Sequence, residues 1–163
     1  MAKSVDLSPA VLFSPFAVGE PGHRVFLLVG SDLVEEITLK IEKGQLVALQ
    51  AALISALSRL GRPHELSGEP GPLASAAFDW AAGALEVGVD PGSESIEVVA
   101  TELSEEEPAT ARFVISTETA AQFTITTTRL IEGGRPPCPL CGFPLDPHGH
   151  ECPRTNGHRA PLR

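Results

Sequence analysis

All three cysteines of the chain fall within one short stretch near its C-terminus, between Cys138 and Cys152. The first two form a Cys-x2-Cys pair, Cys138 and Cys141, and Gly142 follows directly. Glycine lets the backbone turn tightly after such a pair, so that amide N–H groups point at the thiolate sulfurs. This arrangement is typical of a zinc knuckle. A segment this small has no core of its own, so we expect metal binding to supply most of its folding energy.

Zinc takes four tetrahedral ligands of nitrogen and sulfur type. We expect the ligand set to be Cys138, Cys141, His150 and Cys152. His150 is the best fourth ligand because it lies two residues before Cys152 in a second glycine-containing turn, and His148 and His158 are the reserves. Four protein ligands make a structural site, whereas a catalytic zinc keeps one position open for water. If His150 is not a ligand, the open position keeps a catalytic interpretation alive.

Two other interpretations of the cysteines are a redox pair and unrelated free thiols. A thioredoxin-like pair would open a helix after a strand, which Pro139, Gly142 and Pro144 do not allow. Part of the zinc-deaminase signature is also present, but that motif needs His-x-Glu upstream of its cysteines. Here His150 and Glu151 are adjacent and follow the pair, so we reject it.

Charge is distributed unevenly along the chain, whose formal net charge is −9. Residues 1–134 carry 8 basic and 19 acidic side chains, whereas residues 135–163 carry a net +2. An acidic body repels phosphate backbones, which makes nucleic acid an unlikely partner. No stretch approaches the ~20 apolar residues of a membrane span, and the N-terminus does not resemble a signal peptide. Thiols that bind a metal must stay reduced, as they do in the cytoplasm. We therefore expect a cytoplasmic protein that does not enter a membrane.

The body repeats itself along the sequence. Residues 17–22 line up with residues 87–92 at an offset of 70, and both segments hold an acidic-Pro-Gly turn between apolar runs. The register continues with residues 26–29 on residues 96–99. Further on the offset becomes 74, where Ile37, Leu39, Ile41, Leu46 and Leu49 fall on Ala111, Phe113, Ile115, Ala120 and Phe123. Each half therefore predicts strand, turn, strand, loop, strand and helix. Chance similarity between two hairpins is the alternative.

The first helix is predicted by leucines that recur at three- and four-residue spacing. These are Leu46, Leu49, Leu53, Leu57 and Leu60, and Gly61 with Pro63 ends the helix. The second helix, Thr117 to Glu132, is contested because its threonines favour a strand. The start signal at Ser116, the glycines at 133 and 134 and the repeat register favour the helix. The Pro- and Gly-rich residues 61–76 are the expected linker, and residues 104–109 an acidic loop.

The predicted fold class is α+β. Duplicated βββα units over residues 12–62 and 77–134 would form a mostly antiparallel sheet of about six strands with two helices. The body then spans residues 1–134, and a zinc-binding tail spans residues 135–163 with its C-terminal zinc knuckle.

The tail also carries a resemblance to a known family. The residues concerned are Cys138–Gly142, Pro144, Asp146–Pro147, Gly149–His150, Cys152–Arg154 and Asn156–His158. They resemble the ending of an uncharacterised bacterial domain-of-unknown-function family of similar length. The resemblance extends through Gly19, Pro21, Gly22 and the first helix, and so over nearly the whole chain. It implies the metal set given above and that body and tail belong together, but it implies no activity.

Little else in the sequence predicts chemistry. Outside the tail there are only two histidines, His23 on a predicted hairpin turn and His64 in the linker, and no cysteine. Trp80 is expected in the core. We therefore expect a zinc-containing, non-enzymatic binding or adaptor protein whose partner is another protein, and a homodimer is possible. The alternatives are an enzyme with its site between the two halves, and nucleic-acid binding through the basic zinc tail.

Overall fold

Seven strands and two α-helices follow one another along the part of the chain that the computed structural model describes, residues 1–61, 71–132, 138–141 and 152–155. The first half holds β1 (Val5–Leu7), β2 (Leu12–Val18), β3 (Val25–Ser31), β4 (Glu36–Ile41) and α1 (Lys43–Leu60). The second half holds β5 (Trp80–Asp90), β6 (Ser95–Glu102), β7 (Thr110–Ser116) and α2 (Thr117–Glu132), and a single 3-10 turn, η1 (Pro153–Thr155), follows in the tail. None of the helices in these ranges is both long and apolar enough to cross a membrane.

The strands form one sheet in the order β1-β7-β6-β5-β4-β3-β2. Strands β2, β3 and β4 pair antiparallel, as do β5, β6 and β7. Two parallel pairs complete the order, β4 with β5 and β1 with β7. The predicted α+β class and the mostly antiparallel sheet with two helices are confirmed. The prediction missed β1, because three residues are too few to establish an alternating pattern.

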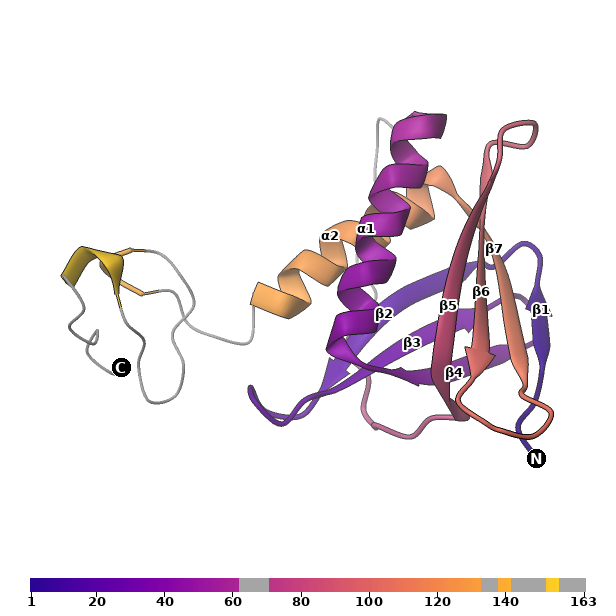
Figure 1. The fold of residues 1–163 in the computed structure, drawn as a ribbon, viewed down its shortest axis with the longest axis horizontal. Helices are drawn as coiled ribbons and strands as arrows, with labels where there is room; N and C mark the ends of the chain where they lie inside the picture. The colour runs from indigo at the N-terminus through magenta and orange to yellow at the C-terminus, as the bar shows by residue number, and fades with distance from the viewer. Residues whose placement is uncertain (62–70, 133–137, 142–151, 156–163) are drawn as a thin grey trace.

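The sheet curls until its two ends meet. Strands β1 and β2 stand at opposite ends of the order, yet only residues 8–11 connect them, which limits the path from Leu7 to Leu12 to about 18 Å. This connection hydrogen-bonds to β7 and β3, the strands next to the two ends, with 2.9 Å from the Ala10 N–H to the Val114 carbonyl and 2.7 Å from the Val11 N–H to the Ser31 carbonyl. In Figure 1, β2–β4 run across the view and β5–β7 stand upright beside them.

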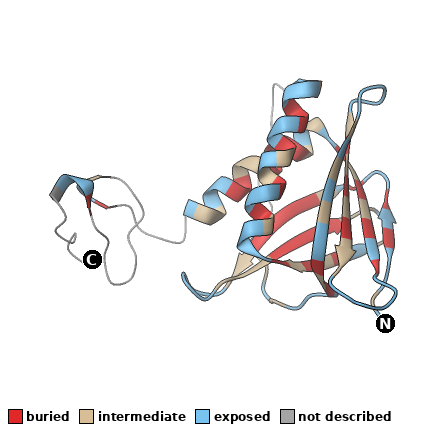
Figure 2. Ribbon diagram, viewed as in Figure 1, coloured by how far each residue is buried: buried red, intermediate tan, exposed pale blue. Residues whose placement is uncertain are grey.

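The core fills the space inside this curled sheet and under the helices, where Figure 2 shows the buried positions of the facing elements. Phe13 of β2 is buried in this core. Its ring centroid is 5.0 Å from that of Phe113 on β7 and 5.0 Å from that of Phe123 on α2. Strand β2 therefore meets the consecutive elements β7 and α2, which are far from it in sequence, at one aromatic cluster. Trp80 is 3 % exposed, as expected of a core residue, and its indole N–H donates to the Lys3 carbonyl.

Helix α1 matches its prediction. It begins after Glu42, whose carboxylate accepts a backbone N–H of the first turn while the Gln45 side chain accepts the Glu42 N–H. Such a capping box satisfies N–H groups that have no partner inside the helix. The helix ends at Gly61, which has φ +91°, a conformation that favours glycine. Four of the five leucines that predicted the helix are buried, and Leu60 is half-buried.

Helix α2 spans Thr117–Glu132, the predicted range, in spite of its threonines. The Ser116 hydroxyl accepts the Thr119 N–H at 3.1 Å and caps the start. Two of the threonine hydroxyls bond back to carbonyls of the preceding turn, Thr124 to Ala121 and Thr128 to Thr124. Their hydrogen-bonding capacity is thus met without leaving the helix.

Each helix packs on a strand of the other half. Helix α1 lies against β5, and α2 lies mainly against β2. The two helices also contact each other on one side of the sheet (Figure 1). There the Gln50 amide donates to the Thr124 carbonyl and to the Thr128 hydroxyl, both at 2.8 Å.

The repeat register can be followed through these elements. Both halves run through three strands and a helix, β2–β4 with α1 and β5–β7 with α2. All ten positions equated at the offset of 74 are buried: Ile37, Leu39, Ile41, Leu46, Leu49, Ala111, Phe113, Ile115, Ala120 and Phe123. Two unrelated amphipathic units would also bury their apolar positions in this way. Duplication of one unit therefore remains a prediction.

Candidate metal centre

The three cysteine sulfurs lie together. The Sγ atoms of Cys138, Cys141 and Cys152 are all within 4.8 Å of one another, and those of Cys138 and Cys152 are 3.9 Å apart. None of the three forms a disulfide. Zinc–sulfur bonds of about 2.3 Å in a tetrahedron place two sulfurs about 3.8 Å apart. The measured separation fits sulfurs that share one metal ion.

Local backbone geometry places these sulfurs. Residues 138–141 form a turn in which the Leu140 N–H donates to the Cys138 sulfur at 3.4 Å, the contact expected of a knuckle. Cys152 stands directly before η1. Cys138 and Cys152 are buried, with 3 % and 1 % of their surface exposed, and Cys141 is half-buried. The three cysteines therefore form a small cluster of their own, separate from the core of the body.

Electrostatics at the cluster favour the thiolate. Burial raises the pKa of the Cys138 thiol, but the N–H groups of Cys141 and Leu140 and the neighbouring thiols lower it by more. The net pKa lies below the ordinary value for a thiol. Since the thiolate is the form that binds metals, the same contacts that shape the turn also prepare the sulfur as a ligand.

Three of the four predicted ligands are thus brought together. The fourth, His150, lies outside the described residues, as do the reserve ligands His148 and His158. His64 of the linker is also outside them, whereas His23 is exposed on the turn between β2 and β3, where the sequence predicted it.

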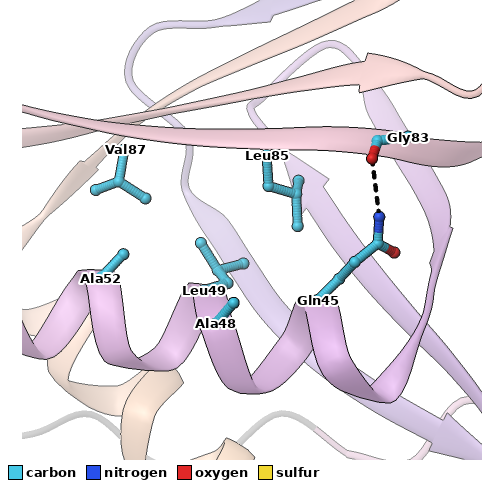
Figure 3. A pocket seen from close by; sticks show the side chains of 7 residues that line it. All are labelled: Gln45, Ala48, Leu49, Ala52, Gly83, Leu85 and Val87. Atoms are coloured by element: carbon cyan, nitrogen blue, oxygen red, sulfur yellow. Dashed lines mark hydrogen bonds between the residues drawn. The ribbon is translucent and has the colours of Figure 1, made fainter.

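A second feature escaped the sequence analysis. Between α1 and β5 lies a pocket of about 250 Å³, lined by Gln45, Ala48, Leu49, Ala52, Gly83, Leu85 and Val87 (Figure 3). Gln45 closes one end, because its amide donates to the carbonyls of Ala82 at 3.0 Å and Gly83 at 3.2 Å. The sequence did hold a signal, since Gly83 interrupts an apolar strand and marks a bulge there.

Comparison with known proteins places the chain in a family. The family model described as "Protein of unknown function (DUF3090)" matches residues 9–152. The chain belongs to the DUF3090 family. The match begins within the connection between β1 and β2 and ends at the last cysteine, so it leaves out β1 but includes β2 to α2 and all three cysteines. The resemblance to an uncharacterised family is confirmed. Neither the curated proteins nor the solved structures hold a match to this DUF3090 chain.

Proposed function

We propose that this DUF3090 protein is a zinc-containing, non-enzymatic binding or adaptor protein. In this proposal zinc is structural and is held by Cys138, Cys141, His150 and Cys152. The observation that carries it is the sulfur triangle, with its 3.9 Å edge between Cys138 and Cys152. Soft thiolate ligands in a tetrahedral arrangement select zinc over the hard cations, which prefer oxygen.

A nitrogen ligand would complete the site. Three thiolates with one imidazole give a closed Cys3His site of the structural type. His150 suits this role because the chain reaches it two residues before Cys152, whose sulfur is already in place. With every position filled by protein, no water binds the metal, and the metal orders the tail instead of performing chemistry.

The chemistry of the pocket between α1 and β5 supports a binding role. Its lining consists of alanine, glycine, leucine and valine with the single amide of Gln45, and holds no carboxylate, imidazole or thiol. An active site needs convergent groups that can act as nucleophile, acid or base. The pocket lies between α1 of the first half and β5 of the second, where the alternative enzyme would have its site, so its apolar lining counts against that alternative.

Elemental mass spectrometry of the purified chain tests the metal centre. We expect one zinc per chain, lost in Cys152→Ser and weakened in His150→Ala. His148→Ala and His158→Ala are the matched controls and should retain it. Zinc that persists in His150→Ala but disappears in one of these two controls would reassign the fourth ligand. A chain without zinc would overturn the proposal.

The binding role needs a separate test. The intact chain and a Cys138→Ser/Cys141→Ser double variant would be used as baits in native lysate, and captured proteins would be purified and recombined with each bait. A partner that binds the intact chain directly supports the adaptor role, and its loss in the double variant assigns the tail to the interface. Turnover of a small molecule by the pure chain would favour the enzyme instead. The cytoplasm is the proposed compartment, since reducing conditions keep thiols available for a metal.

A further inference from the structure

Strand β5 has a long open edge. It is 11 residues long, yet it pairs with β4 only at Trp80 and Ala81. Its other edge pairs with β6 as far as Asp90. From Ala82 onward, no strand among the described residues covers the edge that faces away from β6. Unpaired edges of this kind are templates for another strand.

The backbone groups that face this open edge follow from the register. The Glu102 N–H donates to Ala109 on the β7 side at 2.8 Å, and backbone groups alternate in direction along a strand. Even-numbered residues of β6 therefore bond toward β7 and odd-numbered ones toward β5. Because Val99 pairs with Glu86, the even-numbered residues of β5 bond toward β6. The residues left to present N–H and C=O groups to the open edge are Leu85, Val87 and Val89.

A groove with small side chains runs beside this edge. Leu85 and Val87 point from β5 toward α1, where Ala48 and Ala52 lie on the facing side of the pocket (Figure 3). The alanines leave the pocket of about 250 Å³ between helix and strand. A strand added to β5 would direct every second side chain toward this space, because side chains alternate between the two faces of a sheet. Apolar side chains suit the lining.

Acidic residues on the face of β5 that points away from the groove determine which outward side chains an added strand should carry. Glu86 and Asp90 of β5 are both exposed and point away from the groove, in alternation with Leu85 and Val87. Opposite charges attract across neighbouring strands, and like charges repel. The outward residues of an added strand should therefore be basic. A second copy of β5 would bring its own glutamate and aspartate to the same place, so self-pairing is disfavoured.

We propose that the open edge of β5 and the groove beside α1 form a docking site for an extended segment of a partner protein, in which apolar residues alternate with lysine or arginine. Main-chain hydrogen bonds to Leu85, Val87 and Val89 hold the segment, and the groove selects its apolar side chains, which is binding by strand addition. This inference rests on the proposed binding role and names its partner class.

A labelled peptide of alternating valine and lysine is the probe, and fluorescence anisotropy with the full chain is the measurement. We expect saturable binding that weakens by about tenfold or more when the amides facing β5 are N-methylated, since several hydrogen bonds are lost together. The same residues in an order without alternation, and a valine–glutamate peptide, should bind far more weakly.

Two pairs of variants locate the site. Ala48→Phe fills the groove and should abolish binding, whereas Val47→Phe places the same ring on an exposed neighbour that does not line it. Glu86→Lys should weaken binding of the valine–lysine peptide, and Glu36→Lys makes the same charge change at an exposed residue of β4. Binding that survives Ala48→Phe, or no binding by the intact chain, would overturn the docking site. Dimerisation that Ala48→Phe abolishes would replace the partner with a second copy. If the chain captures a partner but does not bind the peptide, the docking site is wrong and the proposed binding function still stands.

Discussion

The ring of Phe113 on β7 lies directly against the backbone of Gly30 on β3. A methyl group on Gly30 would come within 2.3 Å of the Phe113 Cε1 atom, and within 3.4 Å of a methyl carbon of Leu7. Strands β3 and β7 are not neighbours in the sheet, so the contact crosses the interior. Curling of the sheet brings these two residues together, and the absence of a side chain on Gly30 makes room for the ring.

Gly30→Ala should therefore destabilise the body. The ring or the strand must shift to admit the methyl group, and overpacking of this kind costs about 1–3 kcal/mol. Chemical denaturation followed by Trp80 fluorescence measures the loss. Gly88→Ala is the control, because a methyl group there meets no atom within 4 Å. Equal effects of the two substitutions would contradict the packing described here.

Thr127→Val should stabilise the protein. Thr127 is fully buried on α2, and its hydroxyl has no hydrogen-bond partner among the described residues. Replacing an unpaired buried hydroxyl by a methyl group of similar size removes a desolvation cost of about 1–3 kcal/mol. Thermal unfolding should shift upward. Thr128→Val should act in the opposite direction, since the Thr128 hydroxyl accepts from Gln50 and donates to Thr124.

Gln45→Leu should loosen α1 from β5. The substitution removes the acceptor of the Glu42 N–H and the donor to the carbonyls of Ala82 and Gly83. Loss of a cap and of these bonds should lower the free energy of unfolding by about 1–2 kcal/mol. Hydrogen exchange of the first turn of α1 would localise the effect. Gln122→Leu, which loses one long bond to Thr126, should cost less, and a larger loss there would count against this role for Gln45.

Removal of the metal should release the tail and spare the body. The cysteine cluster is separate from the core that holds Trp80, so chelation should expose all three thiols to a thiol reagent without shifting the emission of this single tryptophan. Acidification should act in the same way, because protons compete with the metal for the thiolates. A large change in tryptophan emission would show instead that the body depends on the metal.

The turn between β3 and β4 should depend on the ionisation of Asp32. Its Oδ1 accepts the N–H groups of Val34 and Glu35, both at 2.7 Å. The N–H of Glu35, followed by that of Val34, lowers the Asp32 pKa below the ordinary value of an aspartate. A depressed carboxyl pKa contributes stability above the unfolded pKa, and this contribution is lost as the pH falls through the folded pKa. An NMR titration should place the pKa of the Asp32 carboxyl below the ordinary value of an aspartate. Asp32→Asn should remove the pH dependence of the Val34 and Glu35 amide shifts.

The elements that the sequence predicted are those whose pattern is local. Leucine spacing determined α1, because Leu46, Leu49 and Leu53 all face the core. For α2 the threonines gave the opposite signal, and the helix was favoured by the start signal at Ser116, the glycines at 133 and 134 and the repeat register. The physical reason is that Phe123 is buried against Phe13, a tertiary contact that outweighs strand propensity. The cysteine spacing likewise predicted the sulfur cluster.

The features that the sequence did not predict depend on distant partners. Strand β1 exists because it pairs with β7, and Val5 and Leu7 alone carry no detectable period. The pocket depends on the separation of β5 from β4 after Ala81, and Gly83 marks only the bulge beside it. The unpaired hydroxyl of Thr127 becomes visible only when its surroundings are known. These features therefore depend on pairing and packing between residues that are far apart in the sequence.

The exchange of helices between the two halves has a consequence for synthesis. On the ribosome α1 is complete before any of β5 has been synthesised. The leucine face of α1 can pack on β5 only after roughly the next 30 residues have been translated, and β2 can pack on α2 only later still. At about 5–20 residues per second this interval lasts seconds. During that time the nascent chain carries an apolar surface with no partner of its own. We expect chains arrested after α1 to associate with a chaperone, and chains released after α2 to fold without one.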